Sequence, residues 1–176
     1  HNIAWLVLDV LAERHHAQQS ELTSRLRSRS FSLDGTEVVL LEPLTYMNLS
    51  GEALNEWRSR HTITDEQLLV VSDDVYLPLG MLRVRAKGSS GGHRGLDSIE
   101  AALGHRDYAR LRIGVNAAES SAELKSHVLE EFTPEETPAV DEAVRFAADQ
   151  FGTTIALIVL TAIYLPLLVL TGLGIV

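Results

Sequence analysis

The pattern of apolar and polar positions along this 176-residue chain predicts helices alternating with strands. Apolar residues recur at helical spacing near residues 2–18, 51–61, 95–103, 121–127 and 135–150. Short apolar or β-branched runs predict strands near residues 29–33, 36–42, 67–72, 81–86 and 109–115, with a tight turn at Asp34-Gly35 between the first two. This alternation predicts an α/β fold, a single three-layer αβα domain with a mixed, mostly parallel twisted sheet.

The segment 150–176 differs in kind from the rest of the chain. No charged residue follows Asp149, and the apolar run from residue 155 is long enough to be a transmembrane candidate, which Pro166 would kink without excluding it. Three interpretations stay open: a membrane anchor, a reading-frame or gene-end artefact, or a helix that packs on the core. We therefore divide the chain into a domain over residues 1–149 and an apolar tail over 150–176, with membrane contact through 151–176 only if the tail is a genuine anchor.

Residues 87–99 (KGSSGGHRGLDSI) place one imidazole, His93, in a loop of four glycines and two serines ahead of an amphipathic helix. Glycine has no Cβ, so the backbone at Gly91 and Gly92 can approach a ligand closely. The N–H groups that open the following helix form an anion site, for which phosphate is the obvious candidate. The alternative is an ordinary turn before a helix.

Two further segments carry candidate chemistry. In residues 43–53 (PLTYMNLSGEA) a strand leads into a loop that contains Asn48, and in residues 68–80 (LLVVSDDVYLPLG) an apolar run ends in Asp73 and Asp74. Carboxylates at the C-terminal end of a buried strand lie where α/β folds place site residues. An aspartate that caps a neighbouring turn is the structural alternative.

These three segments, in this order and at these spacings, resemble the bacterial-type peptidyl-tRNA hydrolase family over roughly residues 1–149. The opening residues 1–5 (HNIAW) are similar to the family's Arg-His-Asn segment at the start of its first helix. The resemblance implies hydrolysis of the ester bond between peptide and tRNA, which recycles tRNA in translation. It also implies a preceding strand and asparagine-containing loop that this sequence lacks, so the chain reads as an N-terminally truncated copy.

The resemblance implies roles for individual residues. His1 would be the general base, Asp73 would accept a hydrogen bond from its imidazole, and Asn48 would orient the water or the ester carbonyl. Substrate contacts would come from the motif residues Tyr46, Met47, Asn48, Gly91, Gly92, His93 and Arg94. Arg94 stands where the family usually has an asparagine, and a guanidinium cannot accept a hydrogen bond.

The charge distribution qualifies the net charge of −9, which alone would argue against a nucleic-acid partner. Residues 81–112 contain seven basic and three acidic residues, whereas residues 113–149 contain two basic and nine acidic ones. Arg83, Arg85 and Lys87 therefore predict a basic patch beside the glycine loop, along which the ribose and phosphates of the acceptor end would lie. Ordinary solvated strand faces remain the alternative.

The absence of cysteine excludes a disulfide framework and a thiolate zinc site, and it suits the cytoplasm. The remaining histidines show no metal-ligand spacing, so neither a metal nor a cofactor is expected. We expect a monomeric cytoplasmic hydrolase whose partner is peptidyl-tRNA, membrane-attached only if the tail is an anchor. Two alternatives stay open: a non-catalytic RNA-binding relative of the same fold, and an inactive fragment.

Overall fold

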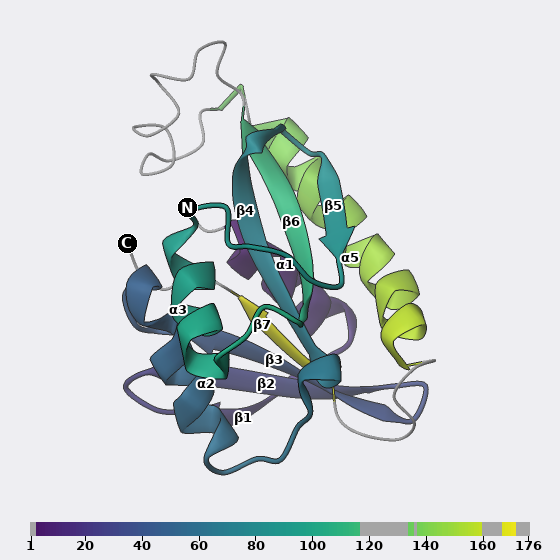
Figure 1. Ribbon diagram of the computed structural model, residues 1–176. Helices are drawn as coiled ribbons and strands as arrows, with labels where there is room; N and C mark the ends of the chain where they lie inside the picture. The colour runs from purple at the N-terminus through teal and green to yellow at the C-terminus, as the bar shows by residue number, and fades with distance from the viewer. Residues whose placement is uncertain (1–2, 117–133, 136, 160–166, 172–176) are drawn as a thin grey trace.

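The chain folds into one mixed sheet covered by helices on both faces, in a computed structural model that describes residues 3–116, 134–135, 137–159 and 167–171 (Figure 1). The helices are α1 (Ile3–Arg14), α2 (Ser50–Arg58), α3 (Arg94–Leu103) and α5 (Thr137–Val159), with the short 3-10 helices η1 (Met47–Leu49) and η2 (Asp65–Gln67). The strands are β1 (Gln18–Leu22), β2 (Leu26–Leu33), β3 (Thr36–Pro43), β4 (Leu68–Pro78), β5 (Leu82–Arg85), β6 (Ala109–Asn116) and β7 (Leu167–Thr171). The expected α/β class is confirmed.

The sheet has the strand order β1-β2-β3-β7-β4-β6-β5. The four central strands β3, β7, β4 and β6 run parallel, and the outer ladders β1·β2, β2·β3 and β5·β6 are antiparallel. Leu33 and Thr36 close the β2·β3 hairpin across Asp34 and Gly35, which have φ values of 50° and 82°. This is the two-residue turn that the Asp-Gly pair predicts.

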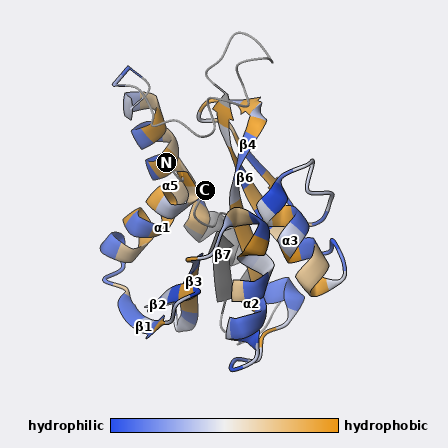
Figure 2. Ribbon diagram, turned by 90° about the vertical axis from the view of Figure 1, so that its left-hand side faces the viewer, coloured by the Kyte–Doolittle hydropathy of each residue, from blue (hydrophilic) through white to orange (hydrophobic). Residues whose placement is uncertain are grey.

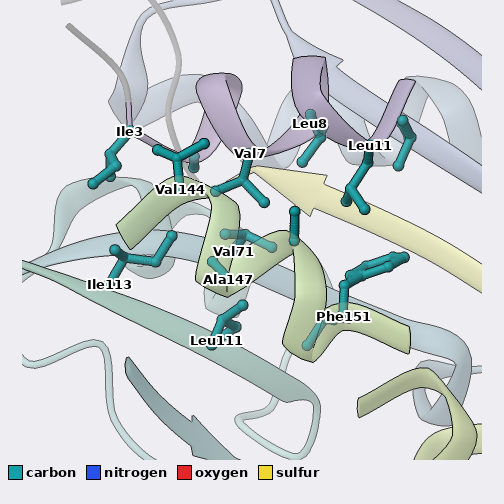
Figure 3. Close-up of a cluster of buried hydrophobic side chains, with 14 of the residues drawn as sticks. Ile3, Val7, Leu8, Leu11, Val71, Leu111, Ile113, Val144, Ala147 and Phe151 are labelled. Carbon is teal, nitrogen blue, oxygen red and sulfur yellow. The ribbon is translucent and has the colours of Figure 1, made fainter. Parts of the chain in front are cut away.

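Two hydrophobic cores lie on the two faces of the sheet. Helices α1 and α5 cover the face that carries the first core, and α2 and α3 cover the face that carries the second core, as the view along the sheet shows (Figure 2). Val71, Leu111 and Ile113 point toward α1 and α5, where they meet residues such as Val7 and Phe151 (Figure 3), and Leu69 belongs to the same cluster. Leu68 and Val70 point the other way, so β4 is apolar on both faces, as a central parallel strand requires.

Strand β7 comes from the C-terminal segment and lies in the middle of the sheet. Its residues 167–170 pair with Val38–Leu41 of β3, and residues 168–171 pair with Leu68–Val71 of β4. Helix α5, which reaches Val159, runs past the boundary at residue 149 that the sequence suggested. No helix in the described part of the chain is long and apolar enough to cross a membrane.

Other observed elements also differ from the predicted ones. Strand β1 was not expected, and β4 continues through the two carboxylates to Pro78 because β6 stays paired with it up to Asn116. Helix α1 ends at Arg14, four residues earlier than its predicted end at 18, because strand β1 already begins at Gln18. The helix expected over residues 121–127 lies outside the described residues.

Tyr108 offers a stability test of the second core. Its ring is buried against the Arg110 guanidinium, 4.1 Å away, and its hydroxyl has no hydrogen-bond partner among the described residues. Because an unpaired buried hydroxyl is costly, we expect Tyr108→Phe to raise the free energy of unfolding by about 1 kcal/mol at neutral pH. Denaturant unfolding measures this change, and a loss of stability of similar size would contradict it.

The same residue predicts a pH dependence. Burial raises the pKa of Tyr108 from 10.0 to about 12, so the unfolded chain loses this proton at a lower pH than the folded chain. The wild-type free energy of unfolding should therefore fall as pH rises from 10 toward 12, and the advantage of Tyr108→Phe should widen over that interval.

Candidate active site

Asp73 and His93 form a buried hydrogen-bonded pair at the carboxyl end of the parallel strands. Asp73 lies on β4, in register with Ile113 of β6, and His93 immediately precedes α3. The His93 Nε2 lies 3.0 Å from the Asp73 Oδ1, with side chains that are 12% and 10% exposed. The pair joins two of the segments that the sequence singled out.

The ring of His93 has both nitrogens engaged. Its Nδ1 accepts hydrogen bonds from the backbone N–H groups of Gly95 and Leu96, at 3.1 and 3.2 Å, so it caps α3. An Nδ1 that accepts must be unprotonated, and the proton of the neutral ring is therefore on Nε2, which donates to Asp73. His93 is thus a fixed donor to the carboxylate, with no ring nitrogen left to accept a proton from water.

The loop that carries Asn48 packs beside α3. Ser98 Oγ of α3 accepts a hydrogen bond from the Gly51 N–H at 2.9 Å, and a Cβ on Gly51 would come within 2.2 Å of the Ser98 carbonyl oxygen. The side chains of Tyr46 and Asn48 are exposed, whereas Met47 is partly buried against the first core. Close packing of α2 on α3 thus fixes the position of η1, from which Asn48 is presented to solvent.

His1 lies outside the described residues, which begin at Ile3. Ile3 is buried in the first core, and Figure 3 shows it at the same end of that cluster as Ile113, with Val144 nearby. Since Ile113 is in register with Asp73, helix α1 begins at the end of the sheet where the carboxylate lies. The predicted bond between His1 and Asp73 stays a prediction.

Asp74 holds a second polar cluster next to the pair. Its Oδ2 accepts from Arg83 at 2.6 Å and from Arg112 at 3.1 Å, and its Oδ1 accepts from the backbone N–H of Tyr76 at 2.9 Å. Arg112 and Arg110, both on β6, are buried. Strand alternation could have revealed them. Residues 110 and 112 lie on one face of β6, whereas Leu111 and Ile113 of the same strand face the first core on the opposite side of the sheet.

The basic patch is therefore smaller than its sequence suggests. Arg110 and Arg106 are paired with Glu100, and Arg112 is paired with Asp74, so these three of the seven basic residues in 81–112 have carboxylate partners. Arg83 is partly exposed but also paired with Asp74. Among the described residues, the exposed cations around the glycine loop that have no ion-pair partner are Arg85, Lys87 and Arg94.

No metal site accompanies this arrangement among the residues that the structure describes, which contain no group of three or more His, Cys, Asp or Glu side chains suited to a metal ion. The Asp–His pair and the exposed cations of the adjoining loop form a polar site at the carboxyl end of the parallel strands. Such a site suits acid–base chemistry on a substrate that carries phosphates.

Comparisons with solved structures place the chain among hydrolases that share this mixed α and β architecture. It matches a peptidyl-tRNA hydrolase crystallised with N-propanol at 27% identity and a TM-score of 0.76, over 86% of this chain and 77% of that one. The peptidyl-tRNA hydrolase from Acinetobacter baumannii matches at 28% identity and a TM-score of 0.74, over 89% and 78% of the two chains.

Sequence comparisons narrow this class to one family. The pattern of the peptidyl-tRNA hydrolase family matches residues 1–162. The peptidyl-tRNA hydrolase of Geobacillus kaustophilus is 41% identical over 149 residues, which are 85% of this chain and 80% of that protein. The enzyme of the same name from Caldanaerobacter subterraneus shows the same identity and coverage. This chain belongs to the peptidyl-tRNA hydrolase family.

Proposed function

We propose that this chain hydrolyses the ester bond between a peptide and the terminal ribose of tRNA. Family membership supports the reaction, and the hydrogen bond between Asp73 and His93 is the observation that supports its location. Water attacks the ester carbonyl, the bond to the ribose oxygen breaks, and that oxygen takes up a proton. The products are a free peptide and a tRNA, and they imply a place in translation and therefore in the cytoplasm.

His1 is our proposed general base. A neutral imidazole titrates in the range that a base for water requires, and His93 is already engaged at both nitrogens. The Oδ1 of Asp73 is taken by His93, but no donor among the described residues reaches its Oδ2. Asp73 can therefore accept a second hydrogen bond from the base and stabilise the imidazolium that forms when water loses its proton.

The remaining groups bind the substrate in this proposal. Asn48 orients the water or the ester carbonyl, and Tyr46, Met47, Gly91 and Gly92 line the approach of the acceptor end. Arg85, Lys87 and Arg94 are exposed and contact phosphates, with Arg83 beside them. All these groups come from one chain, so a monomer suffices for activity.

Release of labelled peptide from peptidyl-tRNA tests the proposal directly. We expect the full chain to release peptide in a reaction that scales with protein concentration. Tight binding of tRNA without any release would instead favour the alternative of a non-catalytic RNA-binding relative. The absence of both binding and release would favour the inactive fragment.

The exposed cations predict a salt dependence of tRNA binding. Each phosphate contact releases condensed counterions, so Arg85→Ala and Lys87→Ala should each lower the slope of log affinity against log salt by about one unit. Arg60→Ala is the matched control, because Arg60 is bound to Glu21 on the far part of the sheet. Filter binding over a salt series gives the slopes, and equal slopes in all variants would contradict the assignment.

A further inference from the structure

A cavity of about 200 Å³ lies at the end of the sheet away from the Asp73–His93 pair. Val39 of β3, which lines this cavity, and Leu68 of β4 both pair with residue 168 of β7, so the cavity is level with the start of β4. Asp73 follows five residues later on β4. At about 3.3 Å per residue this is an offset of about 17 Å along the strand. The cavity is therefore separate from the proposed active site.

The size of the cavity and its apolar wall suit a small ligand. Sites for drug-sized molecules measure roughly 300–1,000 Å³, so this one fits a molecule with fewer heavy atoms. Its apolar wall is formed by Trp57, Val39 and Ile63, which are 2%, 7% and 8% exposed. Hydroxyl groups and two glutamates complete the lining. Such a cavity accepts a short carbon stem that carries polar groups.

Trp57 offers an unused hydrogen-bond donor in this lining. Its ring stacks on the imidazole of His61, with ring centroids 4.2 Å apart and an angle of 13° between the planes, so each ring supports the other. The indole N–H of Trp57 has no hydrogen-bond partner among the described residues. Because a buried indole N–H usually finds a partner, this donor is available to an acceptor oxygen of a ligand.

The charges of the lining favour a cation. Glu21 is already neutralised, because its Oε1 is bonded to His61 and its Oε2 accepts from Arg60 at 2.8 Å. Glu37 is exposed and has no ion-pair partner among the described residues. The described residues that line the cavity include no lysine or arginine. The carboxylate of Glu37 therefore attracts a positive group and repels an anion.

We propose that this cavity binds a small organic cation that also carries an oxygen acceptor, which is the chemistry of an amino alcohol. The ammonium group binds Glu37, the oxygen accepts from the indole N–H of Trp57, and the carbon stem lies against Val39 and Ile63. This inference goes beyond the proposed hydrolysis, since none of these residues belongs to the proposed active site.

The test uses 5-aminopentan-1-ol, which has an ammonium group and a hydroxyl group at opposite ends of a short stem. The readout is the NMR signal of the Trp57 indole N–H. The chain has two tryptophans, and Trp5 of α1, on the other face of the sheet, is the internal reference. A Trp5→Phe variant assigns the two signals. We expect a saturable shift of the Trp57 signal and no shift of the Trp5 signal.

Three analogues separate the contributions of the two polar groups. Pentylamine lacks the oxygen and pentane-1,5-diol lacks the cation, so each should bind at least about threefold more weakly than 5-aminopentan-1-ol. The anion 5-hydroxypentanoate should not bind. All three have the same five-carbon stem, so apolar burial alone would give them equal affinities.

A pair of substitutions tests the carboxylate. Glu37→Gln should weaken the binding of 5-aminopentan-1-ol at least about threefold and leave that of pentane-1,5-diol unchanged. Glu13→Gln is the matched control, because Glu13 is an exposed glutamate at the end of α1 on the other face of the sheet. Glu37 is itself exposed, so neither change disturbs a core.

Four results would each overturn the proposal. The first is a Trp57 signal that does not shift saturably with 5-aminopentan-1-ol, and the second is a Trp5 signal that shifts as much. The third is a diol that binds as tightly as the amino alcohol. The fourth is an equal loss of affinity in Glu37→Gln and Glu13→Gln. None of these measurements involves hydrolysis, so a failure of the proposed function would leave them unaffected.

Discussion

Replacing Asp73 by asparagine should lower the rate of peptide release by at least about a hundredfold. An asparagine oxygen can still accept the Nε2–H of His93, so the loop and α3 should stay in place. What disappears is the negative charge that stabilises an imidazolium at the base. The loss should therefore appear in kcat, while the free energy of unfolding and the affinity for tRNA change little.

The chain contains a matched control for this substitution. Asp65 and His105 form a second Asp–His pair, 2.7 Å apart, between η2 and the end of α3. Asp65→Asn makes the same chemical change to a pair outside the site, and we expect the rate to stay within about twofold of the wild type because mutations at independent sites do not couple. An Asp73→Asn variant with wild-type kcat would remove Asp73 from the mechanism.

The sequence predicted the parts of the site whose chemistry appears in local motifs. The apolar run before Asp73 and the glycines around His93 indicated a site, and the structure brings these two residues together. The sequence did not predict that His93 caps α3, because histidine is not among the preferred N-cap residues. Nor did it predict the buried arginines of β6, because the alternation of Arg110 and Arg112 with apolar residues does not show which carboxylates pair with them.

The fold was predictable where one face of an element is apolar. The β2·β3 hairpin and helix α3 follow from alternation, from the Asp-Gly turn and from helical spacing. Strand β1 was missed because its sequence, QQSEL, is polar and almost fully exposed, so only backbone pairing with β2 defines it. Strand β7 was missed for the opposite reason, since an unbroken apolar run fits a membrane helix and a doubly covered parallel strand equally well.

The interpretation of this C-terminal segment can be tested by shortening the chain. We expect a chain that ends after Val159 to lose cooperative folding, because β7 is the strand that joins β3 to β4. Without it, both neighbours carry unpaired backbone groups in the middle of the sheet. Each buried unpaired group costs about 1–3 kcal/mol, and a domain has only about 5–15 kcal/mol of stability.

A point substitution tests the same strand in the full chain. Val169 is in register with Leu40 of β3 and Leu69 of β4, so Val169→Pro removes an N–H from the centre of the sheet and should destabilise the fold by about 3 kcal/mol or more. Val169→Ile keeps the backbone donor and serves as the matched control. Thermal unfolding followed by circular dichroism measures all three chains. A shortened chain that unfolds at the wild-type Tm would show that the segment is separate from the domain, as a membrane anchor would be.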